Sequence, residues 1–193
     1  MKRRHSTILL VAWLFAGCAD EAVPKPKGWP RLDLPEQAHS AWRDEGAPFA
    51  AEVPTYARIA QRKTDGDTRW YDMRFAQQRA TMHLTYTAVH DDLPALIEKA
   101  HGFKEMHQSK AARIKSDRAL HPEHRVFGSL FNLEGDVATP FVFYLTDSTD
   151  HFLYGTLYFD TRPNADSLSP VTERLRADMR HFAATLEWAP FAQ

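Results

Sequence analysis

Residues 125–160, RVFGSLFNLEGDVATPFVFYLTDSTDHFLYGTLYFD, carry the pattern that decides the fold. They contain three runs rich in aromatic and β-branched residues, at 125–133, 137–146 and 151–160. The connections between these runs, 134–136 and 147–150, have the length of hairpin loops. The stretch therefore predicts three consecutive antiparallel strands. Because Pro140 has no N–H to donate to a strand ladder, we expect the second strand to lie at a sheet edge or to carry a bulge.

Two further strands are predicted upstream of this stretch. Residues 80–88 (ATMHLTYTA) alternate apolar and polar side chains, and this period of two marks a half-buried strand. Residues 69–75 alternate in the same way, and the charged segment 62–68 before them reads as a turn with Asp65-Gly66 at its tip. Residues 111–120 are ambiguous, although a strand is favoured.

Two helices are predicted. Asp91 and Asp92 can cap a helix that has Pro94 in its first turn. Near the C-terminus, Ser169-Pro170 reads as an N-cap and first helical residue, which predicts a helix over about 170–187. Its apolar residues recur at spacings of three and four, namely Val171, Leu175, Met179, Phe182 and Leu186. We expect the intervening charged residues, Arg174, Arg176, Asp178 and Arg180, to occupy the other faces. The fold class that follows is α+β, an antiparallel β-sheet with helices packed against it.

The segment 28–60 is rich in proline, alanine and aromatic residues. Four prolines, at 30, 35, 48 and 54, exclude a long helix or a central strand. We expect an extended segment that wraps across the fold and is held by its aromatic side chains. Residues 28–193 together are predicted to form a single α+β domain of ordinary size.

The N-terminus resembles a bacterial lipoprotein signal. Three basic residues at 2–4 precede an apolar run at 8–15, which is too short to span a bilayer because a spanning helix needs about 20 apolar residues. Ala16-Gly17 then leads to Cys18, the only cysteine, as in the lipobox, although Phe15 replaces the usual aliphatic residue. We therefore expect residues 1–17 to be a cleaved signal peptide and Cys18 to carry lipid such as palmitate. The alternative is a buried free cysteine after a plain secretory signal.

Residues 18–27 are predicted to form the lipid anchor and a polar linker. The acidic pair Asp20-Glu21 reads as solvated linker or, alternatively, as a signal for display on the cell surface. Cleavage of the signal peptide removes three of the 24 basic residues and none of the 25 acidic ones. The mature chain is therefore mildly acidic, and nothing in it indicates nucleic-acid binding.

The densest polar cluster is Asp147-Ser148-Thr149-Asp150-His151. It contains a hydroxyl, a carboxylate and an imidazole, but no G-x-S-x-G elbow or glycine-rich turn accompanies it. Because such residues also bond their own turn backbone, we interpret the loop as a structural turn or a partner-binding surface and predict no catalytic residues. His121 and His124 are close in sequence but lack a third ligand, so we predict no metal site. No cofactor motif is present.

Four stretches resemble the gliding-motility lipoprotein GldD family of the Bacteroidota. They are PKPKGWPRLDLPE (24–36), ATMHLTY (80–86), TPFVFYLTDSTDHFLYGTLYF (139–159) and RPNADSLSPVTERLRADMRHFAATLEW (162–188). The resemblance implies a cell-envelope protein that is required for gliding and associated with type IX secretion. It implies no enzymatic reaction, and its anchor cysteine corresponds to Cys18. The order of strands closed by a C-terminal helix is similar, by fold analogy only, to Mog1/PsbP proteins.

The sequence thus predicts a non-enzymatic accessory or scaffold, lipid-anchored to a membrane and facing the periplasm or the cell surface. Its expected partners are that membrane and other gliding or secretion proteins. The alternative is a lipid-anchored domain that binds or hydrolyses a small envelope ligand. A pocket lined by His83 and residues 147–151 would favour this alternative.

Overall fold

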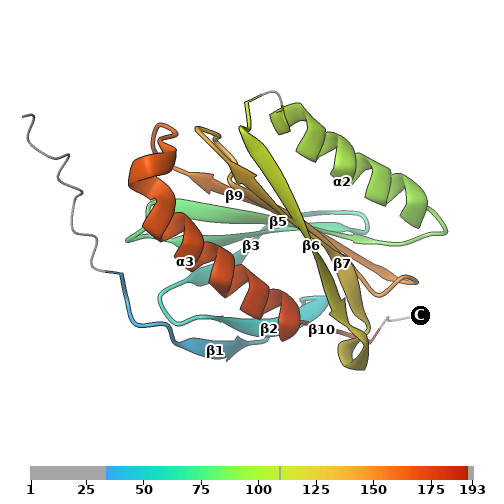
Figure 1. Ribbon diagram of the computed structural model, residues 1–193. Coiled ribbons are helices and arrows are strands. Elements are labelled where there is room, and N and C mark those ends of the chain that lie inside the picture. Colours follow the sequence, from blue (N-terminus) through green and yellow to red (C-terminus); the bar gives the residue numbers. More distant parts are fainter. Residues whose placement is uncertain (1–33, 109, 191–193) are drawn as a thin grey trace, which may run out of the picture. The chain divides into compact units, whose positions relative to one another are not determined.

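The computed structural model describes residues 34–108 and 110–190, except for the side chains of residues 104, 107 and 108. The predicted signal peptide, Cys18 and the linker lie outside these residues. The elements in chain order are β1 (His39–Trp42), β2 (Phe49–Pro54), β3 (Arg58–Asp65), β4 (Thr68–Phe75), β5 (Ala80–Ala88), α2 (Leu93–Gln108), β6 (Arg113–His121), the 3₁₀ helix η2 (Pro122–His124), β7 (Val126–Glu134), β8 (Phe141–Thr146), β9 (His151–Phe159), α3 (Ala165–Ala184) and β10 (Glu187–Trp188). Figure 1 shows how they are arranged.

Seven strands form one antiparallel sheet in the order β3-β4-β5-β9-β8-β7-β6. The strands β7, β8 and β9 are neighbours in this order, so the predicted antiparallel run of three strands is confirmed. The strand predicted at residues 80–88 is β5, and its side chains alternate between buried and half-buried along its whole length. With two helices packed on antiparallel sheets, the α+β class is confirmed.

Pro140 does not affect the strand that it was expected to disturb. The strand β8 begins one residue later, at Phe141, and lies inside the sheet between β7 and β9. The missing N–H of Pro140 costs no hydrogen bond here, because Pro140 takes part only as an acceptor. Its carbonyl oxygen accepts the N–H of Leu133 at 2.9 Å. The expectation of an edge or bulged strand was therefore wrong.

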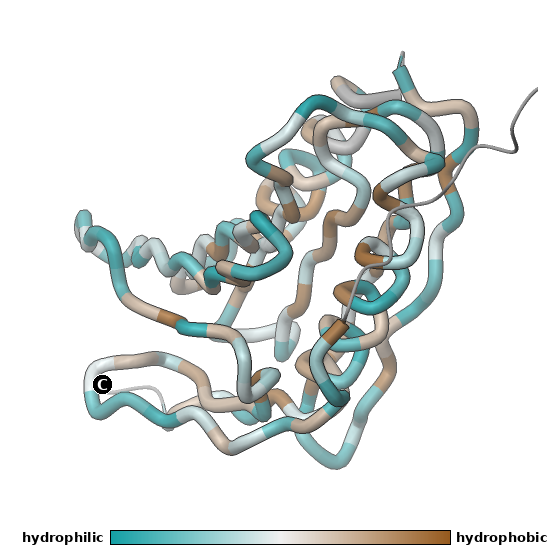
Figure 2. Tube along the Cα trace, turned by 90° about the vertical axis from the view of Figure 1, so that its left-hand side faces the viewer, coloured by the Kyte–Doolittle hydropathy of each residue, from teal (hydrophilic) through white to brown (hydrophobic). Residues whose placement is uncertain are grey.

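The main core lies on the face of the large sheet that α3 covers (Figure 2). The apolar stripe predicted for this helix is confirmed for Val171, Leu175, Met179 and Phe182, which are all buried. Leu186 is buried too, but it lies beyond the end of the helix at Ala184. These side chains pack with the inward residues of β4, β5, β8 and β9, among them Met73, Leu84, Phe143 and Leu153. Burial of one such side chain contributes roughly 1.5–3 kcal/mol, so this layer holds α3 to the sheet.

The segment expected to wrap without a central strand forms a second, three-stranded sheet instead. Its order is β1-β2-β10, and β2 is its central strand. Pro48 precedes β2 and Pro54 is its last residue, so both prolines fall at strand ends where a missing N–H breaks few ladder bonds. Strand β2 pairs with β10, more than 130 residues away, with Phe49 opposite Trp188.

Helix α3 begins earlier than Ser169-Pro170 predicted. It starts at Ala165, and Asn164 is its N-cap because the side-chain oxygen of Asn164 accepts the N–H of Ser167 at 3.0 Å. Pro170 therefore lies inside the helix. A second difference concerns charge, because Arg176 and Asp178 are both buried and do not face solvent as expected.

Helix α2 covers part of the opposite face of the large sheet, over β8 and β9. Strand alternation sets this division, because Phe143 and Leu153 point to the α3 side whereas Tyr144 and Phe152 contact residues of α2. The predicted first helix is confirmed.

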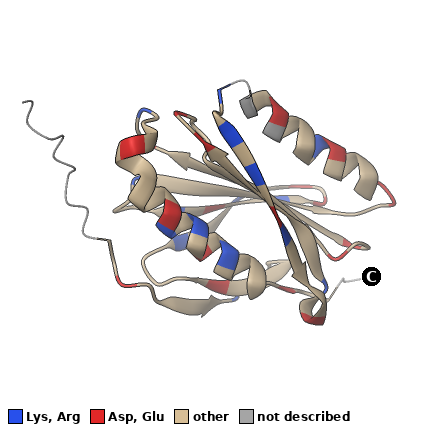
Figure 3. Ribbon diagram, in the orientation of Figure 1, with Lys and Arg blue, Asp and Glu red and all other residues tan. Residues whose placement is uncertain are grey.

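Figure 3 shows lysines and arginines along β6, one of the two edge strands. None of the helices described here is long and apolar enough to cross a membrane.

Candidate functional site

The turn from Asp147 to His151 is organised by one buried carboxylate. Oδ1 of Asp147 accepts the backbone N–H groups of Thr149, Asp150 and His151 at 3.0, 2.8 and 2.9 Å. Its Oδ2 accepts the Thr149 hydroxyl at 2.9 Å and lies 3.5 Å from the guanidinium of Arg125. Burial opposes ionisation of Asp147, but these backbone N–H donors stabilise its charge, so its pKa lies below the usual value. Asp147 is therefore the side chain that shapes the turn.

Ser148 is the residue of the turn that has a left-handed backbone conformation. Its φ is +73°, a conformation that favours glycine over other residues. Its N–H donates to Oγ1 of Thr146 at 3.0 Å, and its side chain is exposed. Within the described residues, no hydrogen bond joins the Ser148 hydroxyl to His151. The loop therefore brings a hydroxyl, a carboxylate and an imidazole together in sequence without the geometry of a nucleophile and its base.

His151 belongs to the interior. It is 4% exposed, its Nδ1 lies 2.8 Å from the Tyr86 hydroxyl, and its ring stacks on Trp188 with centroids 5.1 Å apart. Burial lowers the pKa of His151 below its ordinary value, against the opposing attraction of Asp147 and Asp150. His151 is thus held neutral near pH 7, and its ring fixes the C-terminal strand β10 against β9.

A cavity of about 440 Å³ lies beside this turn. Its lining includes Glu123, Arg125, Asp150, Glu187 and Trp188. It is a charged surface hollow. The hydrogen bonds of Asp147 support a structural turn directly, and the partner-binding surface stays a prediction.

His83 lies on the other face of the sheet from this turn. It sits opposite Asp72 and Thr156 in the strand registers, whereas His151 lies opposite Ala88 and faces the α3 side. Nδ1 of His83 is 2.8 Å from Oδ1 of Asp72. A single pocket lined by His83 and residues 147–151, which would have favoured the ligand-binding alternative, is therefore not formed.

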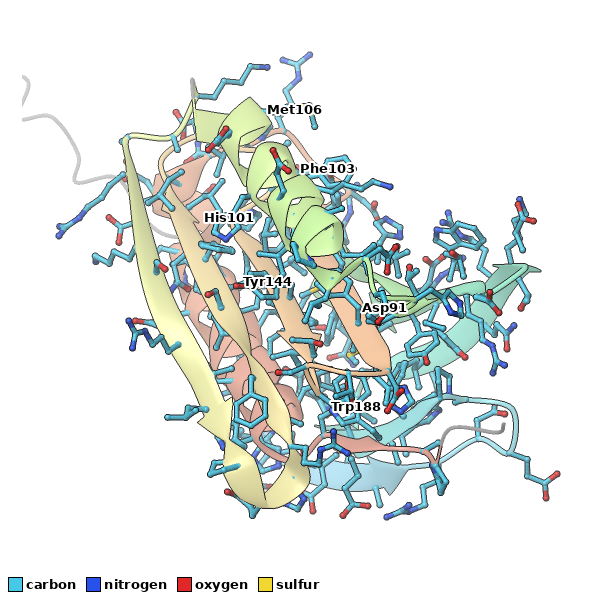
Figure 4. The ribbon with its side chains drawn as sticks, turned by 90° about the vertical axis from the view of Figure 1, so that its right-hand side faces the viewer. Asp91, His101, Phe103, Met106, Tyr144 and Trp188 are labelled. Carbon is cyan, nitrogen blue, oxygen red and sulfur yellow. The ribbon has the colours of Figure 1, made fainter. Side chains whose placement is uncertain are left out.

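The sequence reasoning missed a groove between α2 and the outer face of β4, β5 and β9. Its volume is about 450 Å³, and Figure 4 shows α2 with Phe103 above the strands of this face. The lining residues are Thr68, Trp70, Thr85, Thr87, Leu96, Lys99, Ala100, Phe103, Phe152, Tyr154, Thr156 and Tyr158. Lys99 and Phe103 are exposed, Ala100 and Phe152 are buried, and the other lining residues are half-buried. The signal in the sequence was the polar side of the alternation in 80–88, where threonines recur beside aromatic residues.

A second missed cluster surrounds Asp178 on α3. Its carboxylate, completely buried, accepts the Tyr56 hydroxyl and lies 3.1 Å from Nε2 of His39. The His39 ring stacks on His181 with centroids 3.9 Å apart. Burial and the bond to Asp178 raise the pKa of Tyr56. These contacts attach the start of β1 and the β2–β3 turn to α3, and we assign them a structural role.

Neither His121 nor His124 belongs to a metal-ligand cluster, since no group of three or more suitable side chains occurs among the described residues. Cys18, the predicted lipid attachment site, lies outside those residues.

Comparison with known proteins identifies the family. No curated protein matches the chain, and no solved structure matches it. A family profile described as gliding motility lipoprotein GldD matches residues 19–188 of the 193. Because this match covers nearly all of the chain after the predicted signal peptide, the protein belongs to the gliding motility lipoprotein GldD family.

Proposed function

We propose that this GldD-family protein is a lipid-anchored, non-enzymatic accessory or scaffold that serves gliding and acts with the type IX secretion machinery. Family membership supports the gliding and lipoprotein parts of the proposal. The signal-like residues 1–17 and the single cysteine, Cys18, support anchoring at a membrane of the cell envelope. The link to type IX secretion rests on what the family resemblance implies.

The non-enzymatic part is supported above all by the bonding of Asp147. This carboxylate already accepts three backbone N–H groups and one hydroxyl of its own turn. A catalytic carboxylate would instead orient a base that faces a nucleophile. His151, the only imidazole of the loop, is directed to Tyr86 and Trp188 in the interior.

One observation favours a ligand-binding role in addition. The groove beside α2 has the volume of a small-molecule site and combines aromatic and hydroxyl groups. It lies on the opposite face from the turn, so binding there is compatible with a scaffold role and needs no hydrolysis.

The proposal is tested by complementing a deletion strain with the wild-type chain, Cys18→Ser, or the adjacent control Ala19→Ser. We expect Cys18→Ser to leave the detergent phase, because no other residue can accept the lipid, and to lose gliding. We also expect the deletion to retain type IX cargo inside the cell, measured by quantifying secreted cargo in the medium.

Two outcomes would contradict the proposal. If Cys18→Ser still partitions into the detergent phase, the protein is not anchored through lipid on Cys18. If a non-gliding deletion strain secretes cargo normally, the proposed link to type IX secretion is wrong. Ala19→Ser keeps Cys18 and should behave as wild type in every assay.

A further inference from the structure

We propose that the groove beside α2 binds an acidic oligosaccharide, with sugar rings against its aromatic side chains and an anionic group at Lys99. This inference goes beyond the accessory role, and its site lies on the sheet face opposite the Asp147–His151 turn. It rests on the arrangement of the groove floor, on the hydroxyl groups in that floor, and on the one charged residue of the lining.

The floor consists of cross-strand rows in which aromatic and hydroxyl side chains are neighbours. Strand registers place Trp70 opposite Thr85 and Thr85 opposite Tyr154. In the row before it, Thr68, Thr87 and Phe152 are aligned in the same way. Directly opposed side chains in such rows lie about 5 Å apart at Cβ. Each aromatic ring in the floor is thus beside a hydroxyl group.

The floor is also elongated. Along β9 its residues run from Phe152 to Tyr158, which is about 20 Å at the rise of a strand. Helix α2 bounds one long side through Leu96, Lys99 and Phe103. Ten of the twelve lining residues retain exposure, so the groove is open along its length. An elongated, open groove accommodates a linear chain of rings better than one compact molecule.

The threonines determine which chemistry fits. A purely hydrocarbon ligand would remove the hydroxyls of Thr68, Thr85, Thr87 and Thr156 from water without giving them partners, at a cost of about 1–3 kcal/mol for each buried group. A pyranose ring has an apolar C–H face and hydroxyls around its edge. Its face can lie on an aromatic ring while its edge bonds the neighbouring threonines, so the sugar satisfies both parts of the floor.

Charge supplies the acidic part of the proposal. Lys99 is the only charged residue in the lining, and within the described part of the chain it forms no ion pair. A second ammonium group, Nζ of Lys63, lies 5.2 Å from the ring centroid of Trp70, but its charge is partly balanced by Oδ2 of Asp65 at 3.5 Å. Lys99 therefore supplies the positive charge that favours a carboxylate or phosphate on the ligand.

The polar groups continue past the end of the groove. Tyr158, in the lining, has its ring centroid 5.7 Å from that of His83. Nδ1 of His83 lies 2.8 Å from Oδ1 of Asp72, which orients the His83 ring. The same carboxylate also lies 3.9 Å from Nε of Arg62 and 3.7 Å from Nη2 of Arg74. This ordered histidine offers a further hydrogen-bonding edge to a sugar that extends beyond Tyr158.

The test is isothermal titration calorimetry on the full chain in nanodiscs of zwitterionic lipid. The probes are tetragalacturonate and a hyaluronan tetrasaccharide, which are acidic, the neutral maltotetraose, tetraglutamate as a charged peptide, and dodecanoate. We expect saturable binding of at least one acidic saccharide, with weaker binding of maltotetraose. Tetraglutamate and dodecanoate should bind more weakly than that saccharide, because neither offers rings with hydroxyl edges.

Variants locate the binding. Lys99→Gln, on the exposed side of α2, should lower the affinity for the acidic saccharide about three- to fivefold, which is the contribution of an exposed ion pair. The affinity for maltotetraose should not change. Thr85→Val keeps the shape of the side chain and should weaken both saccharides. Lys110→Gln, outside the groove, is the matched control and should change neither affinity.

Three results would overturn the proposal. The first is the absence of binding by both acidic saccharides. The second is binding of tetraglutamate or dodecanoate that is as tight as binding of the acidic saccharides. The groove would then recognise only negative charge or an extended chain, and not sugar rings. The third is an equal loss of affinity in Lys110→Gln and Lys99→Gln, which would place the binding elsewhere.

Discussion

Nη2 of Arg176 lies 2.9 Å from the carbonyl oxygen of Pro140 and so bonds α3 to the residue that precedes β8. The same nitrogen donates to the carbonyl oxygen of Leu133 at 3.0 Å, and Nη1 lies 2.6 Å from Glu173. Arg176 is only 6% exposed. One guanidinium therefore satisfies two carbonyl oxygens at the join between helix and sheet, although the helical pattern had placed it toward solvent.

The first prediction follows from this contact. Arg176→Ala should lower the free energy of unfolding by about 2–4 kcal/mol, because two buried carbonyl groups lose a charged donor. Arg180→Ala, one turn later and 45% exposed, should cost less than about 0.5 kcal/mol. Urea denaturation of both variants measures the difference, and equal midpoints would show that the Arg176 bonds contribute nothing.

A second prediction contrasts two glycines. A Cβ at Gly155 would lie 2.3 Å from the ring of Phe143 in the core, whereas a Cβ at Gly102 on α2 would meet no atom within 4 Å. Gly155→Ala should therefore destabilise the protein by about 1–3 kcal/mol through overpacking. Gly102→Ala should stabilise it by up to about 1 kcal/mol, because alanine favours a helix. Thermal denaturation should shift in opposite directions, and a shared direction would contradict the packing described here.

The third prediction concerns pH. The pKa of His151 is lowered in the folded state, so the unfolded chain takes up a proton at a higher pH than the folded chain. Stability should accordingly fall as the pH decreases from about 7.5 to 5, through the ordinary histidine pKa of about 6.5. Asp147 does not obscure this window, because its own lowered pKa keeps it ionised there.

His151→Gln provides the comparison for that effect. The variant lacks the titrating ring, so its urea midpoint should change less between pH 7.5 and 5 than the wild-type midpoint does. If both proteins lose the same stability over this interval, the burial of His151 is not the source of the pH dependence.

Local patterns predicted much of this fold. Alternation identified β5 with its bounds, and the spacing of Leu175, Met179 and Phe182 gave the buried side of α3. The small sheet was missed because β1 and β10 are short and β2 pairs with a strand more than 130 residues away. Asp178 was misplaced for the same reason. Its partners, Tyr56 and His39, come from distant segments that a helical period cannot reveal.

The candidate site divides in the same manner. The Asp147–His151 turn was predictable, because aspartate, serine and threonine bond to nearby backbone within a few residues. The groove was not, since it exists only where α2 crosses Tyr154 and its neighbours on β9. Along that strand the side chains alternate, so that Leu153 and Leu157 are buried on the α3 side whereas Tyr154 and Tyr158 are half-buried on the groove side.

The most direct test of the account compares Ser148→Gly and Asp147→Ala for gliding speed and stability in a complemented deletion strain. Ser148→Gly removes the hydroxyl at a residue with φ of +73° that suits glycine, so we expect a folded protein and wild-type gliding. Asp147→Ala should destabilise the turn by about 1–3 kcal/mol, because three backbone N–H groups lose their acceptor. A Ser148→Gly protein that is folded, present at the wild-type level and membrane-bound, yet gives no gliding, would contradict the non-catalytic account.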